Sequence, residues 1–116
     1  MEINLYVDDL RKIPEGFIGA RNFEEAVDYL SKHKVHILSL DHDLGSYPDG
    51  SIRKTGYDLL KWICENEISI NKIYIHTDNP VGRENMFETL KAARKRNFIS
   101  HDTLIYHYGI VPNRMD

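Results

Sequence analysis

Short apolar runs alternate along this chain with segments of helical periodicity, and this alternation limits the folds that it can adopt. Residues 3–7, 35–40 and 72–75 have the length and composition of buried strands, and residues 103–108 form a weaker fourth run. The intervening segments carry apolar residues at helical spacing. Because strands that alternate with helices are joined by crossover connections, the pattern predicts an α/β fold with a mostly parallel sheet of four to five strands.

Capping residues mark where three expected helices begin. Each is a polar residue whose side chain can accept a hydrogen bond from a free amide of the first turn: Asn22, Thr55 and Asn79. The first two helices are expected to end near His33 and Asn66. The residues expected to face the core from the three helices are Phe23, Ala26, Val27, Leu30, Leu59, Leu60, Ile63, Met86, Phe87, Leu90 and Ala93.

Three segments lie outside this alternation. Residues 10–16 contain Pro14 and Gly16 and are expected to form a loop, and residues 17–20 are expected to form a short edge strand. The tail from Val111 has no periodicity and is expected to fray.

The length and composition fit one small domain that spans residues 1–116. A fraction of 41% hydrophobic residues suffices for one core, and the net charge of −3 gives no basic field that would attract nucleic acid. Cys64 is the only cysteine, so an internal disulfide is excluded, and it is expected at the core or its boundary within a helix. No apolar run could span a bilayer and no basic leader precedes the first strand, so we expect a cytoplasmic protein without membrane contact.

Acidic and histidine side chains directly follow three of the expected strands. The segments are Asp8-Asp9, Asp41-His42-Asp43 and His76-Thr77-Asp78-Asn79. In a parallel sheet every strand-to-helix loop leaves from the same edge, and open α/β sheets bind their ligands there. We therefore expect these residues to form one site. The competing interpretation is that the aspartates end their strands because aspartate favours turns.

Four aspartates are the candidate metal ligands: Asp8, Asp9, Asp41 and Asp43. Carboxylates gathered in one place repel one another and need a cation, a buried guanidinium or protonation. Oxygen ligands without thiolates favour Mg²⁺, Mn²⁺ or Ca²⁺ over Zn²⁺. Mg²⁺ or Mn²⁺ is the predicted cofactor, because Mg²⁺ held by one or two carboxylates commonly serves phosphate chemistry.

Two histidines are candidates for acid–base chemistry. His76 ends its strand, so its ring should lie at the edge of the sheet, and we favour it for proton transfer. His42 lies between two aspartates, and in an extended chain its ring would point opposite to both. His42 therefore belongs either to the site or to the packing beneath it. The other histidines are expected to be structural or surface residues: His33, His36, His101 and His107.

Arg11 and Arg83 are the candidate anion clamps. A guanidinium near clustered carboxylates either pairs with them or binds a phosphate oxygen. Asn79 begins a helix whose free amides could receive an anion, although capping alone would account for this residue. The chain shows no glycine-rich phosphate loop, no nucleophilic serine elbow and no cysteine–histidine arrangement.

The acidic pair after the first strand and Asp41 after a middle strand resemble the layout of response-regulator receiver domains, with Thr77 where receivers place a serine or threonine. The chain is more similar to a divergent branch, the cyclic-phosphate-processing receiver-like domains. The similarity covers Ile3 to about Leu90. The residues that carry it are Asp8-Asp9-Leu10-Arg11-Lys12-Ile13-Pro14, Leu40-Asp41-His42-Asp43-Leu44-Gly45 and His76-Thr77-Asp78-Asn79-Pro80, with Gly82 and Met86.

The resemblance implies a flavodoxin-like, receiver-like fold in three layers and a role in hydrolysing cyclic phosphate ends or related phosphoesters. Two departures from ordinary receivers argue against aspartyl-phosphate signalling. There is little room for a first helix between Asp9 and Phe17, so this helix is expected to be reduced or missing. The lysine usual at the end of the last strand has no counterpart, since Tyr106-His107-Tyr108 stands there.

The first functional hypothesis is a metal-dependent phosphoesterase that acts on a cyclic phosphate or a related nucleotide or RNA-end phosphoester. The aspartates would hold the cation, His76 would transfer the proton, and Arg11 would hold a phosphate oxygen. His42 could supply a second acid or base on the other side of phosphorus. The further candidate substrate contacts are Thr77, Asn79 and Arg83.

The alternative is a domain without turnover. It would be either a receiver-like switch in which Asp41 accepts a phosphoryl group, or a nucleotide-binding module. Both hypotheses predict a phosphorylated small molecule or a nucleic-acid end as the partner. A haloacid-dehalogenase-like phosphatase is a weaker third interpretation of Asp41 and Asp43, because that fold needs a longer chain.

Overall fold

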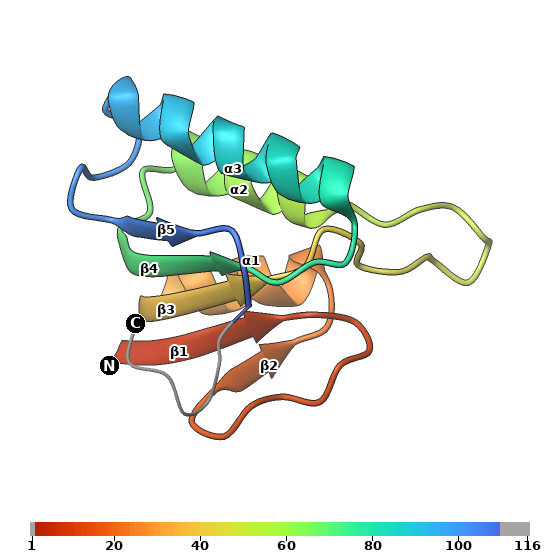
Figure 1. The fold of residues 1–116 in the computed structure, drawn as a ribbon. Coiled ribbons are helices and arrows are strands. Elements are labelled where there is room, and N and C mark those ends of the chain that lie inside the picture. The colour runs from red at the N-terminus through yellow and green to blue at the C-terminus, as the bar shows by residue number, and fades with distance from the viewer. Residues whose placement is uncertain (1, 110–116) are drawn as a thin grey trace.

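Strands and helices alternate in the computed structural model as the apolar pattern predicts, and the structure describes residues 2–109. The elements are β1 (Glu2–Val7), β2 (Ile18–Ala20), α1 (Phe23–Lys32), β3 (Lys34–Leu40), α2 (Gly56–Glu65), β4 (Ile70–Ile75), α3 (Pro80–Lys95) and β5 (Leu104–Tyr106). The strands form one five-stranded sheet in the order β2-β1-β3-β4-β5, and every neighbouring pair is parallel (Figure 1). The tail from Val111, which the sequence predicts to fray, lies outside the described residues.

Each helix begins where its capping residue predicts. The Asn22 side chain accepts a hydrogen bond from the Glu25 amide (2.9 Å), and the Asn79 side chain accepts one from the Gly82 amide (3.0 Å). Thr55 forms a reciprocal capping box at the start of α2. These bonds satisfy amides that helix geometry leaves free, so the three helices start at fixed points of the chain.

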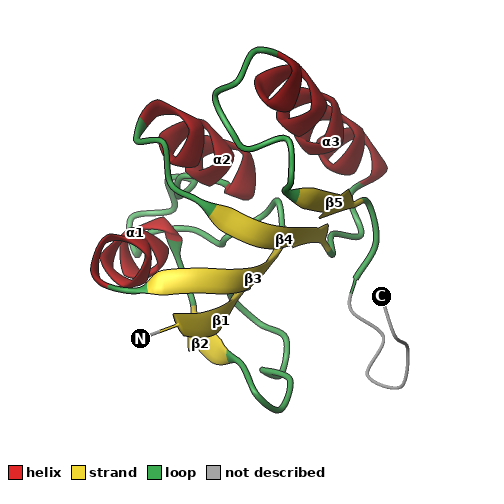
Figure 2. Ribbon diagram, turned by 90° about the vertical axis from the view of Figure 1, so that its left-hand side faces the viewer, coloured by secondary structure: helices red, strands yellow, loops and turns green. Residues whose placement is uncertain are grey.

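All three helices pack on one face of the sheet (Figure 2). The connections from β2 to β3, from β3 to β4 and from β4 to β5 all advance across the sheet in the same direction, and right-handed crossovers therefore carry their helices to the same face. The connection from β1 to β2 runs the other way and is a loop. The core fills the space between this face and the helices, with Leu5, Val7, Leu38, Leu40, Ile73 and Ile75 from the sheet and Leu30, Leu59, Leu60, Ile63, Met86 and Leu90 from the helices.

The opposite face of the sheet carries no helix within residues 2–109. The reduced or missing first helix that the sequence predicts is confirmed, but the three-layer arrangement is corrected to two layers in this part of the chain, because the connection that would supply the third layer is a loop. This face instead carries a row of residues that pair with one another across neighbouring strands: Tyr6, Ser39, Tyr74 and Tyr106.

The helices themselves are short. The longest among residues 2–109 is α3, with 16 residues, and none of the described helices has the length and apolar character needed to cross a membrane. Cys64 lies in α2 and is partly buried, as the sequence predicts.

The carboxyl ends of β1, β3 and β4 bring the predicted site residues side by side. The backbone ladder continues one residue beyond each strand, since the Asp41 amide donates to the Val7 carbonyl and the His76 amide donates to the Leu40 carbonyl (both 3.0 Å). Asp8, Asp41 and His76 are therefore neighbours along this edge. The chain leaves β1 and β3 in opposite directions, so the edge contains the switch point at which flavodoxin-like sheets bind ligands.

Candidate functional site

Three carboxylates converge at the switch point. Oxygen atoms of Asp8, Asp9 and Asp41 all lie within 4.8 Å of one another. Two glycines allow this approach. A Cβ atom at Gly45, where φ is +83°, would lie 3.1 Å from Oδ2 of Asp9. A Cβ atom at Gly56 would lie 2.0 Å from the Asp41 carbonyl oxygen, so only glycine lets α2 begin against the Asp41 backbone.

The Arg11 guanidinium connects carboxylates from three loops. Its Nη1 donates to Oδ2 of Asp8 (2.7 Å) and to Oδ2 of Asp41 (3.2 Å), while Nη2 donates to Asp78. Arg21 holds this loop in place, because its Nη1 donates to the carbonyl oxygens of Asp8 and Arg11. The hydrogen bond to Asp8 raises the pKa of Arg11 above its ordinary value, so Arg11 stays charged. The predicted anion clamp thus pairs with the carboxylates in this structure.

Asp8 is kept ionised by its hydrogen bonds despite being buried. Its Oδ1 accepts from the backbone amides of Leu10 and Arg11 (both 2.8 Å), and its Oδ2 accepts from Arg11 and from Nε2 of His76 (2.9 Å). Burial raises the pKa of Asp8, but the backbone amides, the guanidinium and His76 outweigh burial and lower the pKa to about 2. Asp8 is therefore a fixed negative charge near neutral pH.

The pKa of Asp9 is shifted in the opposite direction to that of Asp8. No lysine, arginine or histidine of the described chain forms an ion pair with it. Burial raises the pKa of Asp9, and the charges of Asp8, Asp41 and Asp43 raise it further. The carboxylate cluster therefore holds more negative charge than Arg11 neutralises. Oxygen ligands with excess negative charge fit Mg²⁺ or Mn²⁺, which is the cofactor class that the sequence predicts.

His76 lies behind Asp8 and is buried. Its side chain is 6% exposed, and its ring stacks on Tyr6 with ring centroids 4.3 Å apart. Nδ1 is 2.7 Å from Oγ of Ser39, and Nε2 contacts Asp8. An ionised carboxylate only accepts, so Nε2 carries the proton and Nδ1 accepts from the Ser39 hydroxyl. Burial lowers the pKa of His76, which Asp8 opposes.

The side chains of His42 and Asp43 lie outside the cluster of three carboxylates. Nδ1 of His42 is 3.0 Å from Oδ1 of Asp43, whose side chain is 69% exposed. The His42 ring packs on the first turn of α3, where a Cβ atom at Gly82 would lie 2.7 Å from it. The structure therefore does not bring Asp43 into the oxygen cluster that it describes, and it places His42 in the packing beside α3.

The remaining predicted substrate contacts surround the start of α3. Oγ1 of Thr77 accepts from the Asn79 amide (3.2 Å), and the Asn79 side chain caps the helix. Nη2 of Arg83 donates to the Thr77 carbonyl (3.0 Å), and its buried Nε has no hydrogen-bond partner among residues 2–109. Their described hydrogen bonds stay within this turn, which they stabilise.

Three residues outside the strand-end segments complete the site: Tyr6, Ser39 and Arg21. Tyr6 and Ser39 each lie two positions before a strand-end aspartate, so strand alternation places them on the same face of the sheet as that aspartate. This spacing is a signal that could have identified them. Arg21 contacts the site through a loop conformation that no periodicity reveals. Asp78, from the predicted strand-end segment, contacts Arg11.

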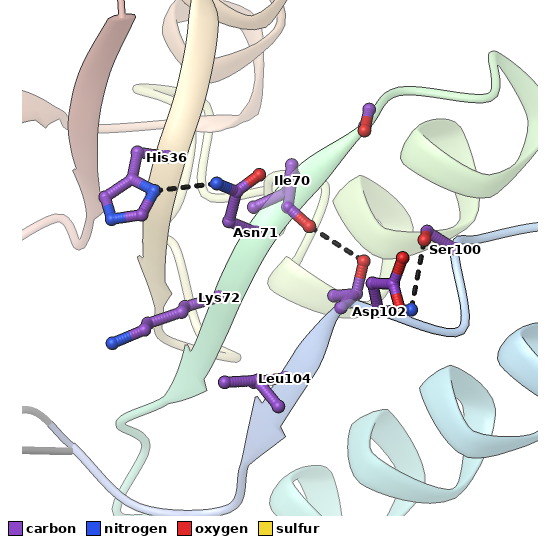
Figure 3. Close-up of a pocket in the computed structure, with 9 residues that line it drawn as sticks. His36, Ile70, Asn71, Lys72, Ser100, Asp102 and Leu104 are labelled. Atoms are coloured by element: carbon purple, nitrogen blue, oxygen red, sulfur yellow. Dashed lines mark hydrogen bonds between the residues drawn. The ribbon is translucent and has the colours of Figure 1, made fainter.

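A separate hollow lies at the opposite, amino-terminal edge of β4 and β5. It has a volume of about 350 Å³, and its lining includes His36, Asn71, Lys72, Asp102 and Leu104 (Figure 3). Nδ2 of Asn71 is 3.0 Å from Nδ1 of His36. None of the predicted site residues lines this hollow, so it is distinct from the carboxylate site.

Comparison with known families agrees with the fold. The model of the cyclic-phosphate processing receiver domain matches residues 3–92, a span that contains Asp8, Asp41 and His76. A search of curated proteins gave no match. Because the family model covers most of the chain and its fold is the one observed, the chain belongs to the cyclic-phosphate processing receiver domain family.

Proposed function

We propose that this chain is a divalent-cation-dependent phosphoesterase that acts on a cyclic phosphate or a related nucleotide or RNA-end phosphoester. The observation that supports this most is the convergence of Asp8, Asp9 and Asp41 at the switch point, with more negative charge than Arg11 neutralises. The membership of the chain in a family linked to cyclic-phosphate processing agrees with this substrate class.

The three clustered aspartates would hold Mg²⁺ or Mn²⁺. The ion would polarise a phosphoryl oxygen and lower the pKa of a bound water. The low pKa of Asp8 keeps it ionised, and its hydrogen bonds to two backbone amides and to His76 fix its orientation. Asp9 would supply the charge that the protein itself leaves without a basic partner among residues 2–109.

His76 would position Asp8 in this proposal, which changes the proton-transfer role expected from the sequence. Both of its ring nitrogens are engaged within the protein, and its side chain is 6% exposed. A group that exchanges a proton with substrate must come within hydrogen-bond reach of it. The chain Ser39–His76–Asp8 instead resembles the supporting hydrogen bonds that orient metal ligands.

Arg11 would contact the phosphate. Its side chain is 36% exposed, and its Nη2 reaches the exposed carboxylate of Asp78. A guanidinium can bind two phosphate oxygens at once, so an anionic substrate could replace Asp78 on this nitrogen.

Hydrolysis of nucleoside 2′,3′-cyclic phosphates tests the proposal. With Mg²⁺ or Mn²⁺ the protein should form the ring-opened monophosphate, and Asp41→Asn should reduce the rate by about 100-fold or more. Asp28→Asn is the matched control, since Asp28 lies on α1 with its side chain 60% exposed and pairs only with Lys32 in the described chain. Equal rates for Asp41→Asn and the wild type would contradict the assignment of the cluster.

A receiver-like switch is the second candidate, because the buried Asp41 follows β3 in the receiver strand order. Its test is the mass of the intact protein after incubation with a small phosphodonor and Mg²⁺. A phosphoryl adduct that disappears in Asp41→Asn, with no hydrolysis of cyclic phosphate, would favour the switch over the phosphoesterase.

A further inference from the structure

The Arg11 guanidinium contacts carboxylate oxygens of two of the three aspartates that would hold a metal ion. Oδ1 of Asp8 accepts two backbone amides, and Oδ1 of Asp41 accepts the His42 amide (2.8 Å). The oxygen of each aspartate that accepts no backbone amide is Oδ2. Nη1 of Arg11 donates to both of these Oδ2 atoms.

A divalent cation and this guanidinium compete for these Oδ2 atoms. Mg²⁺ binds carboxylate oxygens at about 2.0–2.1 Å and requires lone pairs directed at the ion. Oδ2 of Asp8 already accepts from Arg11 at 2.7 Å and from His76 at 2.9 Å. A cation placed between Asp8 and Asp41 would also face the positive charge of Arg11 at close range, which is strongly unfavourable.

We infer that Arg11 is a tethered counter-ion that competes with the divalent cation for Asp8 and Asp41. In the metal-free protein it neutralises part of the negative charge of the cluster, and on metal binding its Nη1 leaves the two aspartates. This inference rests on the cation site of the proposed function, and it adds that the protein carries its own competitor for that site.

The displaced guanidinium of Arg11 could move toward the solvent side of the site, near Asp78. Its side chain is 36% exposed, and its second nitrogen already contacts Asp78, whose side chain is 95% exposed. An anionic phosphate at this outer position would hold the displaced guanidinium as Asp78 does. Because binding couplings are reciprocal, a phosphate ligand should then tighten metal binding, and metal should tighten phosphate binding.

Calorimetric titration with Mn²⁺ tests the competition directly. Arg11→Gln removes the competing charge and should bind Mn²⁺ about tenfold more tightly or better than the wild type, whereas Arg11→Lys keeps a charge and should fall between them. Arg96→Gln is the matched control, because Arg96 is exposed and lies at the carboxyl end of α3. Its affinity should equal that of the wild type.

Thermal unfolding adds a second measurement on the same proteins. In EDTA, Arg11→Gln should unfold at a lower temperature than the wild type. Addition of Mn²⁺ should raise the unfolding temperature of Arg11→Gln by more than it raises that of the wild type. If Arg11→Gln does not fold, NMR signals of the arginine guanidinium groups in the wild-type protein can be used to detect the displacement of Arg11. Titration with Mg²⁺ should shift the Nε–Hε NMR signal that Arg11→Lys removes, and an unchanged signal at saturating Mg²⁺ would overturn the inference.

The outcomes separate this inference from the proposed function. Equal or weaker Mn²⁺ binding by Arg11→Gln would overturn the competition and leave the phosphoesterase proposal standing. Tighter binding without hydrolysis of any cyclic phosphate would support the competition and overturn the proposed reaction. Failure of both proteins to bind Mn²⁺ would overturn both.

Discussion

Asp8 is the residue on which the contacts of the site converge. It receives two backbone amides, one guanidinium and one imidazole while its side chain is only 1% exposed. An ionised carboxylate at such a depth is stable only when its lone pairs are all used in this way. The fold therefore fixes one carboxylate in charge and orientation before any ligand arrives.

The low pKa of Asp8 predicts a stability change in acid. Its pKa falls from the ordinary value of 3.8 to about 2 in the folded protein, so the ionised form stabilises the fold above about pH 4 and this contribution disappears as the pH falls toward 2. Its size is about 2 kcal/mol. Urea unfolding of the wild type and Asp8→Asn should show a free-energy difference that shrinks from pH 5 to pH 2.5. A difference that does not vary with pH would contradict this origin.

Asp9 predicts a change of the opposite sign. Its folded pKa is raised, so its ionised form costs stability at neutral pH, and this cost is lost as the pH falls through that pKa. In EDTA at pH 7, Asp9→Asn should be slightly more stable than the wild type, by less than about 1 kcal/mol. The same variant should bind Mn²⁺ more weakly. A lower unfolding temperature in EDTA would mean that Asp9 has a stabilising partner.

The positioning role of His76 has its own signature. His76→Ala leaves Ser39 and one lone pair of Asp8 without a buried partner, so the free energy of unfolding should fall by about 2–4 kcal/mol. Mn²⁺ affinity should fall with it. His76→Gln keeps an N–H donor and should recover part of both, measured by urea unfolding and calorimetry. A different result would contradict the positioning role: if His76→Ala binds Mn²⁺ as the wild type does and its hydrolysis rate loses only one of the two pH-dependent changes, His76 transfers a proton.

At the scale of single elements, the start of α2 is fixed by one glycine. A side chain at Gly56 would meet the Asp41 backbone at 2.0 Å, and a backbone atom cannot move aside as a flexible side chain can. Gly56→Ala should therefore destabilise the protein by more than about 2 kcal/mol in thermal or urea unfolding. Gly50→Ala is the comparison, since nothing lies within 4 Å and only its positive φ costs energy, about 1 kcal/mol. Equal effects of the two changes would show that α2 can move away from Asp41.

The elements themselves could be predicted because each has a local cause. Short apolar runs predicted the strands. The helices that follow them begin at polar capping residues, which are Asn22, Thr55 and Asn79. The alternation of side-chain directions along a strand does not continue beyond the strand ends, so it did not predict where His42 and Asp43 point. After Asp41 the chain turns, so Asp43 faces solvent and His42 packs on α3, although the two aspartates share a parity in the sequence.

At the scale of the whole molecule, the direction of the connections explains both the fold and the site. Three connections that advance in one direction place every described helix on one face, and the reversal between β1 and β3 creates the switch point where the carboxylates gather. The sequence therefore sufficed to predict that Asp8, Asp41 and His76 would meet. It could not show that Arg11 pairs with two aspartates of the cluster or that the side chain of His76 is buried, because these contacts depend on register and loop conformation.

The central claim is that the carboxylate cluster supports cation-dependent opening of a cyclic phosphate. The most direct measurement is a ³¹P NMR time course of a nucleoside 2′,3′-cyclic phosphate with the protein and Mg²⁺. The cyclic phosphate signal should be replaced by that of a monophosphate, and EDTA or Asp41→Asn should stop this conversion. An unchanged cyclic phosphate signal with the metal-loaded wild-type protein, or conversion that continues in EDTA, would contradict it.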